Sequence, residues 1–165
     1  MIRRTFLSTL LAMPWVLGTS ASAAGSVDLV VVEKRQRTLR LLRGGHTVRT
    51  YRIALGFNPE GHKSREGDGQ TPEGFYRIDG FVAESAYHRA LQISYPNAWD
   101  RRRAMEAGYN PGGQIMIHGL PNGVSAQEVG HGSEDWTNGC IAVTNREIRE
   151  LVALVAVGTP ILIRK

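Results

Sequence analysis

The residue with the clearest chemical potential is Cys140, the only cysteine in this 165-residue chain. A thiol with no second cysteine forms no intramolecular disulfide, so it is either a small buried hydrophobe or a reactive group. Cys140 follows the turn-forming segment Thr137–Gly139 and precedes the apolar segment Ile141–Val143. This order predicts a sulfur at the junction of a turn and a strand, where Gly139 lets the backbone approach a substrate closely.

A cysteine nucleophile needs a base within reach, and that base is most often histidine. Among the five histidines, His118 is favoured because it ends the apolar segment Ile115–Ile117 and is followed by Gly119. A backbone carbonyl can fix the tautomer of a base placed there, without a third catalytic side chain. His131 lies nearer to Cys140 in the sequence but in a polar segment. A zinc site of these three residues is disfavoured because the spacing matches no compact ligand pattern, and we expect no metal or other cofactor.

The first 24 residues have the pattern of a cleavable export signal. Arg3 and Arg4 precede an apolar run from Phe6 to Gly18, and the small residues Ala21–Ala23 follow. The run is shorter than the about 20 residues that span a bilayer, so we expect no membrane anchor. We predict a signal peptide over residues 1–24 and one domain over 25–165. The paired arginines fit a twin-arginine signal and the general secretion route equally well.

Alternating apolar residues and turn signals predict a mainly β domain. The predicted strands cover residues 27–33, 38–43, 46–55, 75–82, 89–96, 112–119, 141–143 and 159–165. A short helix is predicted over residues 97–108, and a second begins at Thr144 with a capping-box pattern to Glu147. The long segment Gly56–Gly74 has no periodicity, and loops of that length are usually functional or disordered.

The formal charge of +5 at pH 7 is modest, and the basic residues are scattered. Arg101–Arg103 is the one basic cluster, and we interpret it as a solvated helix face. No aromatic residues alternate with basic ones as a nucleic-acid platform requires, so a nucleic-acid partner is not expected. A weak positive field fits an acidic polymer such as cell-wall material, although it fits many other soluble proteins too.

Three segments, in this order along the chain, resemble the L,D-transpeptidase catalytic domain, also called the YkuD domain. They are EGDGQTPEGFY at 66–76, IMIHG at 115–119 and TNGC at 137–140. The segment DWTNGCIAVTN at 135–145 resembles the branch of this family related to YafK. The resemblance covers nearly all of the chain after the signal, and it implies a β-sandwich of mixed sheets with about two short helices.

The same resemblance implies a periplasmic enzyme that acts on peptidoglycan stem peptides. The cysteine attacks the carbonyl of the third stem residue, usually diaminopimelate, and D-alanine leaves. The thioester then passes to an amine of another stem, to a lysine of a wall-anchored protein, or to water. The first two outcomes define a transpeptidase and the third defines a wall hydrolase of the same fold.

The motifs assign roles to four catalytic candidates. Cys140 is the nucleophile, His118 is the general base, and the carbonyl of Gly119 orients the imidazole. The backbone N–H groups of Gly139 and Cys140 are the predicted oxyanion hole. The sequence departs from the family pattern at Asn138, where a second histidine is usual, and at Ala142, where an arginine is common.

Five further residues are candidates for substrate contact: Arg65, Tyr95, Trp136, Thr137 and Asn138. Each has a structural alternative. Thr137 and Asn138 suit a turn, Trp136 suits packing beneath the loop, and Tyr95 suits packing at a strand end. Arg65 and its neighbour Lys63 are candidates for binding stem-peptide carboxylates from the long loop.

A non-catalytic peptidoglycan-binding module is the alternative from a different functional class. In this interpretation the fold is kept, and turnover is lost through Asn138 and Ala142. The presence of both Cys140 and His118 argues against it, because a binding module needs neither a nucleophile nor a base.

Overall fold

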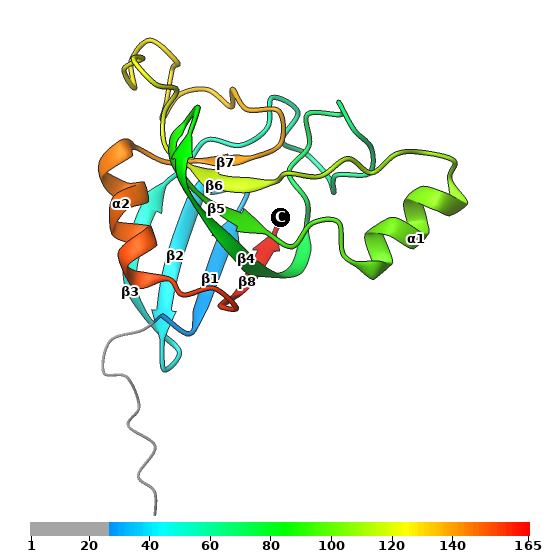
Figure 1. Cartoon of the computed structure of the whole chain (residues 1–165), viewed down its shortest axis with the longest axis horizontal. Helices are drawn as coiled ribbons and strands as arrows, with labels where there is room; N and C mark the ends of the chain where they lie inside the picture. Colours follow the sequence, from blue (N-terminus) through cyan, green and yellow to red (C-terminus); the bar gives the residue numbers. More distant parts are fainter. Residues whose placement is uncertain (1–26) are drawn as a thin grey trace, which may run out of the picture.

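The computed structural model describes residues 27–165, so the predicted signal peptide lies outside the described residues. The domain is built on one mixed sheet of eight strands in the order β3-β2-β1-β8-β4-β5-β6-β7 (Figure 1). The strands are β1 Leu29–Glu33, β2 Thr38–Arg43, β3 His46–Arg52, β4 Gly74–Ser85, β5 His88–Ile93, β6 Met116–His118, β7 Ile141–Ala142 and β8 Pro160–Arg164. The helices are α1 Ala98–Glu106 and α2 Asn145–Leu154. The expected mainly β fold with mixed strand directions and two helices is confirmed.

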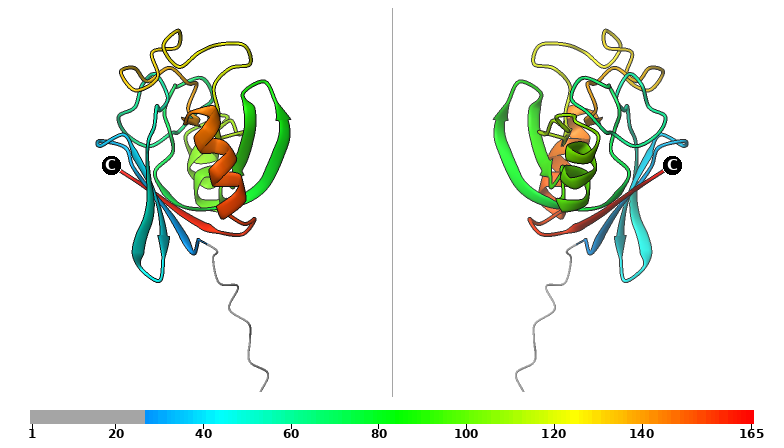
Figure 2. Two further views of the ribbon diagram at one scale, coloured as in Figure 1. Left: turned by 90° about the vertical axis from the view of Figure 1, so that its left-hand side faces the viewer. Right: turned by 90° about the vertical axis from the view of Figure 1, so that its right-hand side faces the viewer.

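The two layers of the domain belong to one continuous sheet, which turns at β4. The first part of β4, Gly74–Arg77, pairs with β8, and the part from Ile78 to Ser85 pairs with β5. Figure 2 shows β4 and β5 on one side of α2 and the strands β1–β3 on the other. The apolar side chains of both halves therefore face one shared core, whose fully buried members include Leu39, Leu41, Ile78, Leu91, Ile117, Ile141, Ile148 and Leu151.

Strand β3 ends at Arg52, three residues before the predicted end at Leu55. After Arg52 the backbone leaves β2 and crosses to β7. There the N–H groups of Ala54 and Ala142 each donate to the other residue's carbonyl, at 3.0 and 2.8 Å. This pair of bonds closes the edge of the short strand β7, which directly follows Cys140.

Helix α2 begins as predicted, because both hydrogen bonds of the capping box are present. The Thr144 side chain accepts from the Glu147 N–H, and the Glu147 carboxylate accepts from the Thr144 N–H. The helix buries Ile148 and Leu151 against the sheet. An ion pair of 2.6 Å between Glu150 and Arg49 ties its exposed side to β3. Helix α2 is thereby fixed next to the strands that carry the candidate site.

Helix α1 lies at the end of the molecule opposite α2 (Figure 1). Asn97 caps it, and Asp100 completes the capping box by accepting from the Asn97 N–H. Asp100 is buried and also accepts a hydrogen bond of 3.0 Å from the Tyr76 hydroxyl, which joins α1 to β4. The side chains of Arg101–Arg103 are exposed, which confirms the solvated face. Over residues 27–165 the structure contains no helix with the length and apolar character that a membrane span requires.

Candidate active site

Cys140 and His118 come from neighbouring strands that run in the same direction. In the β6–β7 pair, His118 lies opposite Ala142, and Cys140 is two residues before Ala142. Because side chains alternate between the two faces of a sheet, Cys140 and His118 share one face. A strand spacing of about 4.8 Å and a rise of about 3.3 Å per residue put their Cα atoms roughly 8 Å apart. Their side chains line the same cavity of about 340 Å³.

The imidazole of His118 is buried and held in one tautomer. Its Nδ1 lies 2.6 Å from the carbonyl oxygen of Gly119. A carbonyl only accepts hydrogen bonds, so Nδ1 carries the proton and Nε2 is the basic nitrogen of the neutral ring. Burial lowers the pKa of His118 below its usual 6.5, although the Gly119 carbonyl works in the opposite direction. The ring is therefore neutral at neutral pH and able to accept a proton.

The sulfur of Cys140 is partly exposed to the cavity and is not sealed in the core. Its Sγ lies 3.6 Å from the carbonyl oxygen of Gln114, within reach of a weak hydrogen bond from the thiol. Burial raises the pKa of the Cys140 thiol, while the Met116 N–H and the positive charge of Lys63 oppose this increase. The resting pair is thus a neutral thiol and a neutral imidazole.

The turn before Cys140 is shaped by the hydroxyl of Thr137, which is almost fully buried. This hydroxyl donates to the Cys140 carbonyl at 2.7 Å and accepts from the Gly139 N–H at 3.1 Å. The second bond occupies the Gly139 N–H and removes it from the predicted oxyanion hole. The Cys140 N–H has no partner among the hydrogen bonds of residues 27–165 and remains the backbone donor at this position.

Gly139 is required by close packing as well as by its backbone conformation. Its φ of 128° lies in a region that side chains rarely tolerate, and a Cβ there would stand 2.7 Å from the Gln70 carbonyl. On the other side of the turn, a Cβ on Gly56 would lie 2.9 Å from the Gly139 Cα. The long loop 56–74 therefore packs directly against the residue that precedes Cys140.

Three of the five predicted substrate contacts line the cavity with Cys140 and His118. These are Trp136, Thr137 and Asn138. The Trp136 Nε1 is buried and has no hydrogen-bond partner among the described residues. The Thr137 hydroxyl, in contrast, is already used inside the turn.

The other two predicted contacts, Tyr95 and Arg65, lie outside this cavity. The Tyr95 hydroxyl donates to the Pro111 carbonyl at 3.0 Å, and its ring packs edge-on against Tyr76, so its role here is structural. Arg65 is exposed and places its guanidinium 5.6 Å from the centre of the Tyr109 ring. The structure brings neither side chain into the cavity of Cys140, because Tyr95 packs against Tyr76 and loop 63–68 turns Arg65 outward.

Two residues that no sequence pattern indicated, Tyr87 and Gln114, also line the cavity. The Tyr87 ring lies over the imidazole of His118, with ring centres 4.4 Å apart. Tyr87 reaches this place because β5 pairs with β6, which sets the β4–β5 turn beside His118. Gln114 has a left-handed backbone with φ of 56°, a strained conformation typical of functional sites. Within residues 27–165 no group of three or more His, Cys, Asp or Glu side chains could hold a metal ion.

Comparisons with known proteins identify the family of this domain. The family model of the YkuD L,D-transpeptidase catalytic domain matches residues 27–163. The chain is 33% identical over 137 residues to YafK of Escherichia coli (strain K12), whose name assigns it provisionally to the L,D-transpeptidases. That match covers 79% of this chain and 48% of YafK, so the chain spans about half the length of the curated relatives it matches.

Solved structures show the same fold. The helical cell shape determining protein Pgp2 of Campylobacter jejuni aligns with a TM-score of 0.66 and 25% identity, over 86% of this chain and 49% of Pgp2. Bd1075 of Bdellovibrio bacteriovorus aligns with a TM-score of 0.61 and 26% identity, over 87% of this chain and 50% of Bd1075. An L,D-transpeptidase of Mycobacterium smegmatis, at 16% identity and a TM-score of 0.55 over 86% of this chain and 59% of its own, shares the fold. This chain belongs to the YkuD family of L,D-transpeptidase catalytic domains.

Proposed function

We propose that this protein is a cysteine L,D-transpeptidase that acts on peptidoglycan stem peptides through a thioester at Cys140, in the periplasm. The observation that carries the proposal is the shared cavity of a partly exposed thiol and a buried imidazole whose free nitrogen is basic. Membership of the family supports the substrate class. Retention of both groups favours an enzyme over a binding module.

In the acylation step, Nε2 of His118 takes the thiol proton while Sγ bonds to the carbonyl carbon of the third stem residue. The carbonyl oxygen becomes an oxyanion, which the Cys140 N–H can stabilise. The C–N bond then breaks, the nitrogen of the leaving amino acid takes the proton from His118, and a thioester remains on Cys140. The Gly119 carbonyl holds the ring in place throughout and favours the imidazolium by accepting from Nδ1.

In the second step an acceptor attacks the thioester carbonyl, and His118 takes the acceptor's proton and returns it to sulfur. An amine of another stem gives a cross-link, and a lysine of a wall-anchored protein gives an attachment to the wall. Water as acceptor gives a shortened stem. Which acceptor attacks the thioester depends on how well the closed site excludes water and positions an amine.

Acylation is tested by incubating the protein with a carbapenem and measuring the intact mass. We expect the mass of one carbapenem on the wild type and none on Cys140→Ser. The His118→Ala variant should be acylated roughly 10²- to 10⁴-fold more slowly, because the base is lost. A wild type without an adduct would favour the binding module, and a loss below about threefold would exclude His118 as the base.

Transfer and hydrolysis are separated by digesting purified muropeptides with the protein and weighing the products. New dimers mean transfer to an amine. Shortened stems without dimers mean that water is the acceptor. The Cys140→Ser variant, which lacks the thiol in both reactions, is the matched control and should give neither product.

A further inference from the structure

A second cavity of about 480 Å³ meets the first one at the nucleophile. Cys140, Asn138 and Gln114 line both cavities. The remaining walls of the second cavity come from three residues of the long loop, between positions 63 and 67, and from residues 112–115. His118 lines the first cavity and is not among the residues that line the second. The substrate's two halves can therefore lie on opposite sides of the sulfur.

The position of the base decides which half lies on which side, and this assignment, like the carboxylate site argued from it, rests on the proposed function. His118 must return its proton to the leaving nitrogen, so the amine half of the scissile bond belongs in the cavity that His118 lines. The acyl half, which stays on the sulfur, then extends into the second cavity. The chemistry of that cavity should match the residues on the acyl side of the bond.

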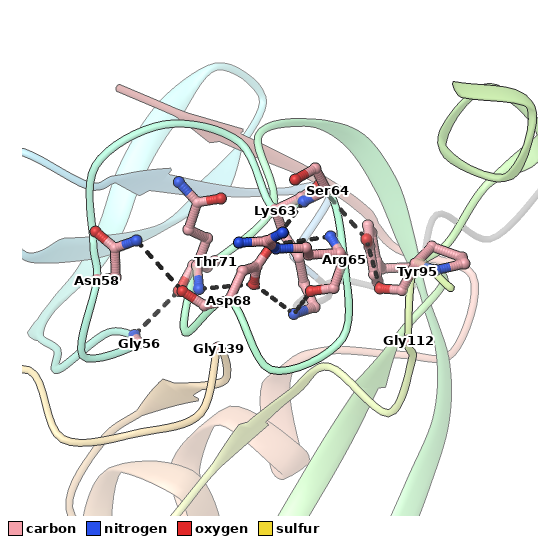
Figure 3. A network of polar contacts seen from close by, with 12 residues as sticks. Gly56, Asn58, Lys63, Ser64, Arg65, Asp68, Thr71, Tyr95, Gly112 and Gly139 are labelled. Carbon is pink, nitrogen blue, oxygen red and sulfur yellow. Dashed lines mark hydrogen bonds and ion pairs between the residues drawn. The ribbon is translucent and has the colours of Figure 1, made fainter. Parts of the chain in front are cut away.

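Lys63 is the one cationic residue that lines the second cavity, and it is buried. Only 3% of this residue is exposed. Its Nζ donates to the Asp68 carboxylate at 2.8 Å and to the Arg65 carbonyl at 3.1 Å (Figure 3). An ammonium has three N–H donors, and the third has no partner among residues 27–165. Lys63 lines the cavity and its counter-ion Asp68 does not.

Asp68 holds the ammonium in a fixed position. Its carboxylate also accepts from the backbone N–H groups of Ser64 at 2.8 Å, Arg65 at 2.9 Å and Gln70 at 3.0 Å. Burial would raise the pKa of Asp68, but these bonds and Lys63 hold it below its usual value. Lys63 is thus immobilised before any ligand arrives, which reduces the entropy lost on binding. A buried, fixed cation with one unused donor is suited to an anionic oxygen.

We propose that the second cavity binds the acyl half of the substrate and that Lys63 binds a carboxylate there. A stem peptide carries two free carboxylates on the acyl side of the scissile bond. One is the α-carboxylate of the γ-linked glutamate, and the other is the distal carboxylate of a diaminopimelate side chain. A lysine at the third position lacks the second group. Lys63 therefore acts as a specificity determinant that distinguishes stems by their acidic groups.

The test compares four synthetic tetrapeptide stems by the kcat/KM for release of the terminal D-alanine. One stem has both carboxylates, two stems each have one of them converted to an amide, and the fourth has lysine as its third residue. We expect wild type to lose roughly 10- to 100-fold on the amide that removes the bound carboxylate. The other amide should change the rate less than about threefold, which identifies the source of the carboxylate. Equal rates on all four stems would overturn the proposal.

The variant Lys63→Met should lower kcat/KM on the unmodified stem by a similar factor and should no longer distinguish it from the amide. Arg65→Met is the matched control, since Arg65 lies in the same loop but outside both cavities. It should keep the full discrimination of wild type. A Lys63→Met protein that still prefers the carboxylate would refute the role of Lys63.

Failure of the inference and failure of the proposed function give different results. If wild type forms no carbapenem adduct and releases no D-alanine from any stem, the proposed function is wrong. If it acts on all four stems alike, only the carboxylate site is wrong. Removal of a buried charge can unfold a protein. The rate at which the neutral reagent iodoacetamide alkylates Cys140 in Lys63→Met, compared with the rate in wild type, therefore checks that the surroundings of Cys140 are kept in the variant. The wild-type substrate series decides the question even if that variant does not fold.

Discussion

We expect the Thr137 hydroxyl to be the main hydrogen-bonding group that stabilises the turn before Cys140, residues 137–139. The variant Thr137→Val tests this expectation. Valine keeps the shape of threonine and removes the hydroxyl that bonds the Cys140 carbonyl and the Gly139 N–H. Each bond contributes about 1 kcal/mol net, and a buried group left without a partner costs about 1–3 kcal/mol. Because Thr137 and Gly139 are both buried, we expect the free energy of unfolding to fall by roughly 2–4 kcal/mol.

Thr38 offers a matched control in the same fold. Its hydroxyl oxygen is buried but has no hydrogen-bond partner among the described residues. The same substitution, Thr38→Val, should therefore leave stability unchanged or raise it by up to about 1 kcal/mol. The difference between the two variants isolates the turn's hydrogen bonds from the general effect of replacing threonine by valine.

The assay is urea denaturation of wild type and both variants. The dependence of the unfolding free energy on urea concentration should be the same in all three proteins. Carbapenem acylation is measured on the same samples. A turn that relaxes by about 1 Å should slow acylation by up to roughly 100-fold in Thr137→Val and not in Thr38→Val. If the two variants unfold within about 0.5 kcal/mol of each other and acylate at equal rates, the Thr137 hydroxyl does not hold the turn.

Three further outcomes are expected. The acylation rate should fall with a single ionisation centred below pH 6.5 as the pH drops, because burial lowers the pKa of His118 and only its neutral form accepts the proton; a limb centred above about pH 8 would indicate thiolate attack without a base. Gly139→Ala should cost roughly 1–3 kcal/mol more than Gly158→Ala in urea denaturation, since both positions have positive φ but only Gly139 faces a clash; equal costs would contradict the packing argument. Burial opposes ionisation of Asp100, yet its bonds to His62, Asn97 and Tyr76 keep its pKa below the usual value. The ionised carboxylate therefore stabilises the fold above the unfolded pKa of about 3.9, and this contribution is lost as the pH falls through the lower folded pKa. If the loss of unfolding free energy in Asp100→Asn relative to wild type stays constant from about pH 6 to pH 2.5, this argument is refuted.

Local signals predicted most of the fold. The capping box at Thr144, the glycine pair after β2 and the alternation of Leu39 and Leu41 each act within a few residues, so the sequence was enough to place α2 and the β2–β3 hairpin. What the sequence could not predict depends on contacts far apart along the chain. The bonds between Ala54 and Ala142, which end β3 early, join residues 88 positions apart.

Some residues of the candidate site could likewise be predicted from local sequence, and others depend on contacts far apart along the chain. Cys140 and His118 could be proposed from residue type and neighbours, because a thiol after a turn and a histidine at a strand end are unusual in themselves. Tyr87 could not be proposed, because its place over His118 is set by how β5 pairs with β6. Lys63 and Arg65 were predicted together, and alternation along an extended chain would place them on one side. The carboxylate of Asp68 instead folds the loop around itself, so Lys63 turns inward and Arg65 outward.

In the proposed mechanism, the raised pKa of Cys140 lets a lone thiol be both reactive and durable. Oxidants and disulfides react with the thiolate, and burial, which raises the pKa of the Cys140 thiol, disfavours that form at neutral pH. Nucleophilicity then depends on transfer of the proton to His118 at the moment of attack, which requires a carbonyl carbon within bonding distance of sulfur. Burial of both groups therefore suppresses side reactions without blocking acylation, whereas a permanent thiolate–imidazolium pair would leave the sulfur open to oxidation between turnovers.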